Sequence, residues 1–161
     1  MKTVRAFVAL GSNIEGPRSQ VERGFAELDE IVGTRVVARS PLYRTSPVGY
    51  LDQPDFVNAV AQIETSLAPV PLLHALFAIE RAHGRVREFK NAPRTLDLDL
   101  LVYGDIVMNE AGLTLPHPRM HERAFVLAPL NDIAPELEIP RRGKVSELLA
   151  ALAGGSPQRM P

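Results

Sequence analysis

The sequence predicts an α+β fold, a mainly antiparallel sheet with helices packed on it, as three observations indicate. Short runs with the strand period of two alternate with segments whose apolar residues recur at helical spacing. Glycines and prolines separate these segments, where turns and helix ends need them. A chain of 161 residues is long enough for one domain with a proper core and short for two. We therefore expect residues 1–161 to form a single domain.

The first part of the chain predicts a strand, a helix and a second strand. Residues 4–10 are an apolar strand, and Pro17 begins a helix that ends at Gly33. The apolar face of this helix consists of Val21, Phe25, Leu28 and Val32. Residues 34–43 form the second strand, and the prolines and glycine of residues 44–54 predict a loop.

A third strand and a second helix follow this loop. Residues 55–64 form the strand, whose aliphatic face consists of Val57, Ala59, Ala61 and Ile63. Its other face carries Phe56, Asn58, Val60, Gln62 and Glu64. The helix begins at Pro69 and ends at Gly84. Its apolar residues are Leu72, Leu73, Leu76 and Ile79.

The next strand carries the two residues around which we expect the site to form. Leucines alternate with Asp97 and Asp99, which is the period of a strand with one buried face. Both carboxylates therefore point the same way, with Cα atoms roughly 6.5–7 Å apart. Two such acids repel each other unless a cation lies between them, and Mg²⁺ accepts carboxylate and phosphate oxygens. The alternative is a strand whose outer face is simply acidic.

The remaining elements complete the predicted fold. A turn at Gly104-Asp105 and a short strand at residues 106–108 follow the acidic strand. The resulting β-α-β-β-α-β order is the ferredoxin-like arrangement, an antiparallel sheet with helices on one face. A C-terminal extension then contains a loop, an apolar segment and a helix, at residues 115–118, 125–130 and 145–152. We expect residues 154–161 to be a flexible tail.

Composition excludes several classes of function. With 45% hydrophobic and 23% charged residues, the chain has the composition of an ordinary globular protein. Its net charge of −1 creates no general basic field, so we expect neither nucleic acid nor a membrane as a partner. The absence of cysteine excludes thiolate chemistry and is compatible with the cytoplasmic location that we expect.

Cationic residues just before the acidic strand favour a small anionic ligand. They are Arg81, Arg85, Arg87, Lys90 and Arg94. Acids that bind a metal beside arginines suit a polyphosphate, because a guanidinium donates two parallel hydrogen bonds to phosphate. A solvated helix end is the alternative for Arg81 and Arg85, which lie one helical turn apart.

Other candidate residues also have an ordinary structural alternative. His117 lies between two prolines and could donate to a phosphate, although a lone loop histidine is usually a surface residue. Phe56 and Asn58 could stack on and hydrogen-bond a flat heterocycle, or Phe56 could simply cover the sheet edge. Two histidines of the second helix, which we interpret as structural or surface residues, are His74 and His83.

Several motifs together resemble the 6-hydroxymethyl-7,8-dihydropterin pyrophosphokinase family, over residues 4–140. The most specific is the run Pro93-Arg94-Thr95-Leu96-Asp97-Leu98-Asp99. The others are Gly11-Ser12-Asn13, Tyr43-Arg44-Thr45, Asp52 to Asn58, Gly84-Arg85-Val86-Arg87 and Pro116-His117-Pro118-Arg119-Met120. The resemblance implies transfer of diphosphate from ATP to the hydroxymethyl group of 6-hydroxymethyl-7,8-dihydropterin, with release of AMP, in folate biosynthesis.

The resemblance also implies a role for each candidate residue. Asp97 and Asp99 would hold two Mg²⁺ ions, and Arg85 and Arg94 would lie closest to the transferred group. The residues implied to bind ATP are Glu80, Arg87, Arg94, Leu100, Thr114, His117 and Arg123. Those implied to bind the pterin are Gly11, Thr45, Val48, Phe56, Asn58, Asp97 and Phe125, with the two phenylalanines on either side of the ring. We expect the enzyme to be a monomer.

Two other functions remain open at this point. A metal-dependent nucleotidyl transferase would use paired acids on the same kind of sheet but would release pyrophosphate instead of AMP. A non-enzymatic RNA-binding domain with a ferredoxin-like fold would need adjacent aromatics on the central strands and a basic surface. The acids on the central strand and the net charge of −1 disfavour this second alternative.

Overall fold

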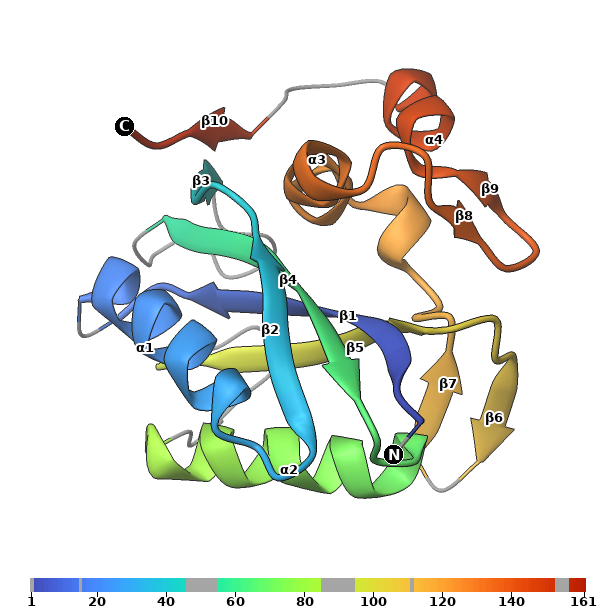
Figure 1. Ribbon diagram of the computed structural model, residues 1–161. Coiled ribbons are helices and arrows are strands. Elements are labelled where there is room, and N and C mark those ends of the chain that lie inside the picture. The colour runs from blue at the N-terminus through green and yellow to red at the C-terminus, as the bar shows by residue number, and fades with distance from the viewer. Residues whose placement is uncertain (1, 15, 46–54, 85–94, 111, 153–156) are drawn as a thin grey trace.

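An antiparallel sheet forms the centre of the molecule (Figure 1). The computed structural model describes residues 2–14, 16–45, 55–84, 95–110, 112–152 and 157–161. The strands lie in the order β5-β1-β4-β3-β10, and β2 also pairs with β4. Their bounds are β1 Val4–Ser12, β2 Thr34–Arg39, β3 Tyr43–Thr45, β4 Phe56–Thr65, β5 Asp97–Tyr103 and β10 Gln158–Arg159. The sequence of elements from β1 to β5 confirms the predicted ferredoxin-like arrangement.

Two helices cover one face of this sheet and enclose the larger core. They are α1 (Pro17–Asp29) and α2 (Pro69–Ala82), and each begins at a proline, as the sequence predicts. The strand residues that pack against them are Ala6, Val8, Leu10, Val57, Ala59, Ala61, Ile63, Leu98 and Leu100. Leu28 and Leu76 are fully buried there. The prediction that Val32 belongs to the buried face is wrong, because α1 ends at Asp29 and Val32 is 84% exposed.

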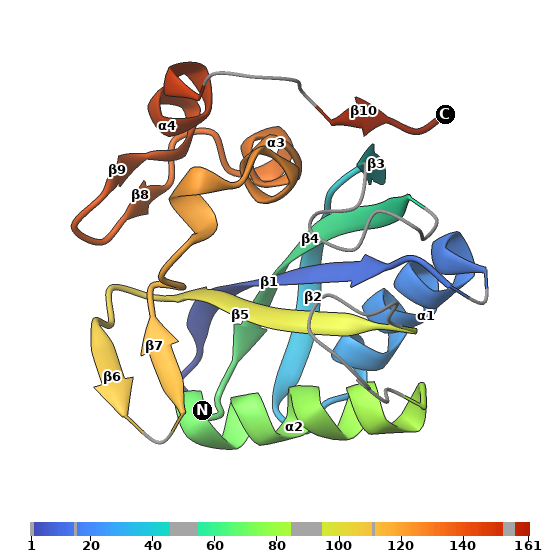
Figure 2. The ribbon, with the colours of Figure 1, turned by 180° about the vertical axis from the view of Figure 1, so that it is seen from behind.

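The C-terminal extension covers part of the opposite face (Figure 2). It consists of the short helix η1 (Met120–Glu122), α3 (Ala124–Ile133), the hairpin of β8 (Glu138–Ile139) and β9 (Gly143–Lys144), and α4 (Val145–Ala151). A second core forms between the extension and the sheet residues Phe7, Val60, Leu101 and Val102. Leu101 and Val102 share this core because a register shift opposite Phe7 interrupts the alternation of β5. The same irregularity separates the apolar end of β5 from its acidic end.

Two strands differ from the expected ones. The strand expected at residues 34–43 is divided into β2 and β3, and Ser40 lies at the break, where its hydroxyl accepts a hydrogen bond from the amide of Val60 (2.8 Å). Proline at position 41 has no N–H with which to continue the ladder. The strand expected at residues 106–108 is instead β6 (Met108–Glu110), which pairs with β7 (Leu113–Leu115) outside the main sheet.

The end of the chain, which we expected to be a flexible tail, pairs with β3 in the structure. Gln158 lies opposite Arg44, and Arg159 lies opposite Tyr43. The guanidinium of Arg159 contacts Asp132 of α3 at 2.7 Å, and the hydroxyl of Tyr43 donates to the same carboxylate. β10 is therefore linked both to the sheet edge and to the extension. In the part of the chain that the structure describes, no helix is both long and apolar enough to cross a membrane.

Candidate active site

The two acids of β5 lie on the sheet face that α1 and α2 do not cover. Leu98 and Leu100 point into the larger core, so the alternating Asp97 and Asp99 point to the opposite face. Both aspartates are half-buried. β5 is also the last strand on its side of the sheet (Figure 2). The predicted period and the shared direction of the carboxylates are confirmed.

A row of residues leads from these acids across the sheet. Gly11 of β1 lies opposite Asp97 of β5 on one side and opposite Asn58 of β4 on the other. Directly paired residues in a sheet share a face, so these three lie together. A Cβ atom on Gly11 would lie 2.9 Å from Oδ1 of Asn58, and the glycine therefore leaves room for the amide. Nδ2 of Asn58 donates to Oγ1 of Thr45 at 2.8 Å, which extends the row to β3.

The two phenylalanines expected to hold the pterin lie on the same side of the sheet. Phe56 lies opposite Thr45, is half-buried, and among the described residues belongs to neither core. Phe125 lies in the first turn of α3, which packs on β3 and β4. It is also half-buried, packs against the second core, and has the guanidinium of Arg123 5.6 Å from its ring centroid. Their use as a clamp stays a prediction.

His117 is fixed beside β5 after the end of β7. Its amide donates to the carbonyl of Leu101 at 2.8 Å, and its Nδ1 accepts from the amide of Arg119 at 3.2 Å. Because Nδ1 is an acceptor, the proton of the neutral ring is on Nε2. Burial lowers the pKa of His117 from its ordinary 6.5 to about 4, helped by Arg123 and Arg142 and opposed by Asp97. The ring is therefore a neutral donor near several guanidinium groups and Asp97.

Three of the other predicted ATP residues lie around β5. Glu80 is 3% exposed, and its Oε2 accepts from the amide of Leu98 at 2.7 Å, which fixes α2 to the acidic strand. The side chain of Leu100 is buried in the larger core, so a ligand contact at this residue would involve its main chain. Thr114 is on β7, where its hydroxyl donates to Asn109 at 3.0 Å. Their roles in nucleotide binding stay predictions.

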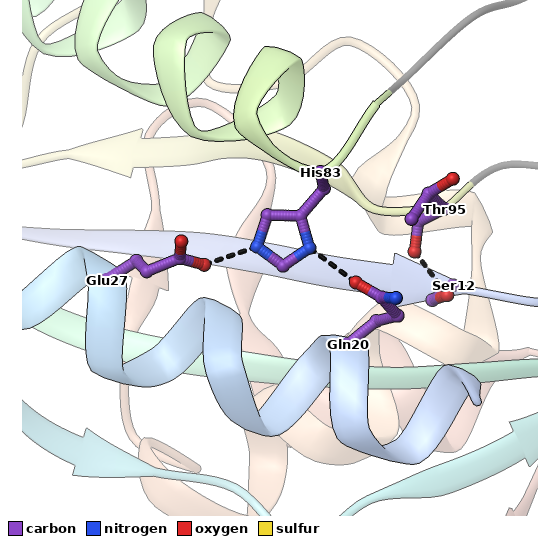
Figure 3. Close-up of polar contacts among 5 residues, drawn as sticks. All are labelled: Ser12, Gln20, Glu27, His83 and Thr95. Atoms are coloured by element: carbon purple, nitrogen blue, oxygen red, sulfur yellow. Dashed lines mark hydrogen bonds and ion pairs between the residues drawn. The ribbon is translucent and has the colours of Figure 1, made fainter. Parts of the chain in front are cut away.

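Four predicted residues lie outside the described residues: Arg85, Arg87, Arg94 and Val48. The structure does show how the chain is held just before and just after residues 85–94 (Figure 3). His83 is 6% exposed, and its ring nitrogens contact Glu27 and Gln20 of α1. The carbonyl of Thr95 accepts a hydrogen bond from the hydroxyl of Ser12.

His83 is thus a structural residue, as predicted, although its two partners could not be identified from the sequence. Glu27 and Gln20 lie seven positions apart on α1, and nothing in their spacing indicates a histidine from another helix. Ser12 does belong to a motif that the sequence singles out, and its contact gives that motif a structural role. These contacts hold α2 and the start of β5 against α1 and β1.

The acidic strand β5 offers two carboxylates, those of Asp97 and Asp99, as metal ligands. Among the described residues, no three His, Cys, Asp or Glu side chains are grouped as a ready metal site. Mg²⁺ commonly binds through one or two carboxylates and completes its shell with water and substrate phosphates. Asp97 and Asp99 fit that donor set. The arrangement suits a metal that binds together with a polyphosphate.

One residue near His117 was missed by the sequence analysis. Nη1 of Arg142, from the turn between β8 and β9, donates to the carbonyl of His117 and to Nδ1 of His121, the latter at 2.9 Å. No motif surrounds Arg142, and about 25 residues separate it from His117 along the chain. The sequence around such a turn residue does not indicate that its side chain contacts a distant histidine.

Comparison with known proteins points to one family. The model of the family described as 7,8-dihydro-6-hydroxymethylpterin-pyrophosphokinase (HPPK) matches residues 7–135. A 2-amino-4-hydroxy-6-hydroxymethyldihydropteridine pyrophosphokinase of Pseudomonas aeruginosa is 48% identical over 157 residues, covering 98% of this chain and 97% of its own. The Haemophilus influenzae protein of the same name is 43% identical over 150 residues, covering 93% and 94%.

A solved structure gives independent support for the fold. The wild-type HPPK-DHPS of Plasmodium falciparum superposes with a TM-score of 0.73 at 15% identity. The match covers 92% of this chain and 44% of that one, so this chain spans less than half of the larger protein. At this identity the likeness concerns the fold alone.

Proposed function

The chain belongs to the 7,8-dihydro-6-hydroxymethylpterin-pyrophosphokinase family, and we propose how its residues divide the work of that reaction. The enzyme transfers diphosphate from ATP to the hydroxymethyl group of 6-hydroxymethyl-7,8-dihydropterin in folate biosynthesis. The hydroxyl oxygen bonds to the β-phosphorus of ATP, the bond from that phosphorus to the α-phosphate oxygen breaks, and AMP leaves. The hydroxyl proton passes to solvent. The observation that carries the proposal is the row from Asp97 through Gly11 to Asn58 and Thr45, beside His117.

The acidic end of the row would hold the metal and the phosphates. Asp97 and Asp99 would bind two Mg²⁺ ions together with ATP, and the metal when bound would neutralise phosphate charge and acidify the attacking hydroxyl. Arg85, Arg87, Arg94 and Arg123 would neutralise the rest of the polyphosphate, with Arg85 and Arg94 nearest the transferred group. Phosphoryl transfer depends mainly on such positioning and charge neutralisation. Glu80, Leu100 and Thr114 would contribute to the nucleoside side of the site.

The other end of the row would recognise the pterin. Asn58 already donates to Thr45, and its carbonyl and second N–H can pair with the edge of a heterocycle. The missing side chain of Gly11 keeps the space over β1 open to this amide. Phe56 and Phe125 would stack on the two sides of the ring, and Val48 would contribute its main chain. The hydroxymethyl group would then point along the row toward Asp97.

His117 would donate from Nε2 to a phosphate as a neutral group. Its lowered pKa, about 4, supports this role because the ring is uncharged at neutral pH. The positive charge beside the phosphates would then come from the arginines and the metal. We assign no general base, since a metal-bound hydroxyl can lose its proton to water.

The setting of the enzyme is also a proposal. We propose that residues 1–161 form a single pyrophosphokinase domain that acts as a monomer in the cytoplasm. Its partners would be its two small substrates, with no nucleic acid or membrane involved. The net charge of −1 supports this, because it provides no general attraction for polyanionic surfaces.

Product analysis tests the function directly. The purified protein is incubated with ATP, Mg²⁺ and 6-hydroxymethyl-7,8-dihydropterin, and nucleotides and pterins are separated by chromatography. We expect AMP and the pterin diphosphate in equal amounts, and no AMP when the pterin is omitted or replaced by its 6-methyl analogue. Release of pyrophosphate without AMP would favour a nucleotidyl transferase. Addition of EDTA should stop the reaction if the metal assignment is correct.

A further inference from the structure

The turn between β8 and β9 has an unusual backbone. The amide of Arg142 donates to the carbonyl of Ile139 at 2.9 Å and closes a four-residue turn. Pro140 occupies its second position, and Arg141 occupies its third with φ of 65°. This is the pattern of a type II turn, whose third position normally requires glycine or asparagine. The turn therefore holds a non-glycine residue in a conformation that costs about 1 kcal/mol or more.

The residue after this strained position reaches back to the candidate active site. Arg142 is half-buried, and its Nη1 donates to the carbonyl of His117 and to Nδ1 of His121. Both acceptors lie on the segment that joins β7 to α3. A guanidinium suits this bridge, because its planar group can hold two acceptors in fixed directions. Arg142 thereby connects the C-terminal hairpin to the backbone of His117.

Three contacts together determine how His117 is held. Its amide donates to Leu101, its ring Nδ1 accepts from the amide of Arg119, and its carbonyl accepts from Arg142. The main chain is fixed on both sides of the Cα atom, and the ring is fixed through Nδ1. Nε2 then carries the proton in a defined direction. Arg142 also lies close enough to His117 to help keep the ring neutral.

We propose that Arg142 is a positioning residue for ATP, which holds His117 so that its Nε2–H meets the polyphosphate. The inference rests on the proposed role of His117 in ATP binding. Arg142 lies beyond residues 7–135, which the family model matches, so the inference concerns a part of this chain outside that match. Its physical basis is preorganisation: a donor already held in its binding direction loses less freedom when the ligand arrives.

A pair of neighbouring substitutions tests the proposal. Arg142→Met removes the bridge, while Arg141→Met removes the same charge from an exposed side chain in the same turn. We expect Arg142→Met to raise the Kd of a non-hydrolysable ATP analogue and the KM for ATP about three- to tenfold, because His117 is no longer held in its binding direction before ATP arrives. The pterin Kd and the kcat should change less than about twofold, and Arg141→Met should match the wild type in each quantity. A lower Tm with unchanged ATP affinity in Arg142→Met would show a purely structural role and overturn the proposal.

A double-mutant cycle separates positioning from direct contact. If Arg142 acts through His117, Arg142→Met should have no further effect on ATP affinity in a His117→Ala background. An undiminished effect in that background would mean that Arg142 meets the nucleotide itself, which overturns the positioning role. If His117→Ala alone leaves ATP affinity unchanged, the proposed role of His117 fails and this inference with it. Formation of AMP by the wild-type enzyme, measured in parallel, tests the overall function separately.

Discussion

The two faces of the central sheet are built from the same strands but differ in what covers them. On one face, α1 and α2 bury an aliphatic surface that includes Val8, Ala59 and Leu98, each at most 3% exposed. On the other face, α3 and its neighbours cover Phe7 and Val60 and leave a row of polar residues beyond them. That row contains the half-buried Asp97 and Asp99. Alternate residues of the same strands therefore form the larger core on one face and the candidate active site on the other.

This difference explains how the site can be polar and still precisely placed. Asp97, Asp99 and Asn58 on the open face each have neighbours one position away whose side chains lie in the larger core. The backbone that carries Asp97 is therefore fixed by Leu96 and Leu98, both nearly inaccessible to solvent. A site built on strands in this way needs little stabilisation of its own. Substitutions on the two faces should accordingly separate activity from stability.

The largest effect should come from the acids on the open face. Asp97→Ala or Asp99→Ala removes a carboxylate from the proposed metal site and should cost several kcal/mol of transition-state stabilisation, about a hundredfold to thousandfold in kcat. The Tm should hold or rise slightly, because repulsion between like charges is relieved. Steady-state kinetics with a thermal melt measure both. The matched control is Asp105→Ala, in the exposed turn after β5; near-normal turnover of the first two variants at saturating Mg²⁺ would refute the metal assignment.

A substitution on the covered face should do the reverse. Leu76 of α2 is fully buried in the larger core, and Leu76→Ala should lower the free energy of unfolding by about 2–5 kcal/mol. The kcat of the folded fraction should stay close to that of the wild type, because Leu76 lies on the face opposite Asp97. Urea denaturation and active-site titration separate the two quantities. Val32→Ala, at a position 84% exposed, serves as a control and should change stability by less than about 0.5 kcal/mol. A large loss of kcat in folded Leu76→Ala would show that the faces are not independent.

His117 lies where the covered and open parts of the second face meet, and it should make stability depend on pH. Its pKa falls from 6.5 to about 4 on folding, so between these values the unfolded state binds more protons. This contribution to stability is complete above pH 6.5 and is lost as the pH falls toward 4, to a total of at most about 3 kcal/mol. Denaturation of wild type and His117→Gln across this range should show the difference. Identical pH profiles would contradict the lowered pKa.

The smallest effect should appear at the pterin end of the open face. Phe56→Leu keeps much of the apolar area but loses a stacking surface worth roughly 0.5–1.5 kcal/mol, so pterin affinity should fall about three- to tenfold. Because Phe56 belongs to neither core among the described residues, the Tm of the Phe56→Leu variant should barely change. Phe125→Leu should also weaken pterin binding but lower the Tm, since Phe125 packs against the second core. Calorimetric titration beside a thermal melt measures both. A lower Tm with unchanged pterin affinity in Phe56→Leu would make that residue ordinary packing.

Local pattern in the sequence was enough to predict the order of elements and the acidic strand. The period of two at Leu96 to Leu100 specifies which side chains share a face, and this follows from strand geometry wherever the strand is placed. Pro17 and Pro69 marked the starts of both sheet-packing helices for a similarly local reason, the fixed φ of proline. The motifs that carry the family resemblance are also contiguous in the chain, and the comparisons confirm the family they indicated.

Contacts between distant residues decided the rest. Only the fold shows that α3 packs on β3 and β4, that β10 pairs with β3, and that Arg142 reaches His117. Val32 fits the helical period yet is exposed, because the helix ends before it. The periodicity of a sequence predicts which residues share a face. Which helices or strands pack on that face depends on elements that are far apart in the chain. The chemistry of the acidic strand was therefore readable from its own residues, and the shape of the site around it was not.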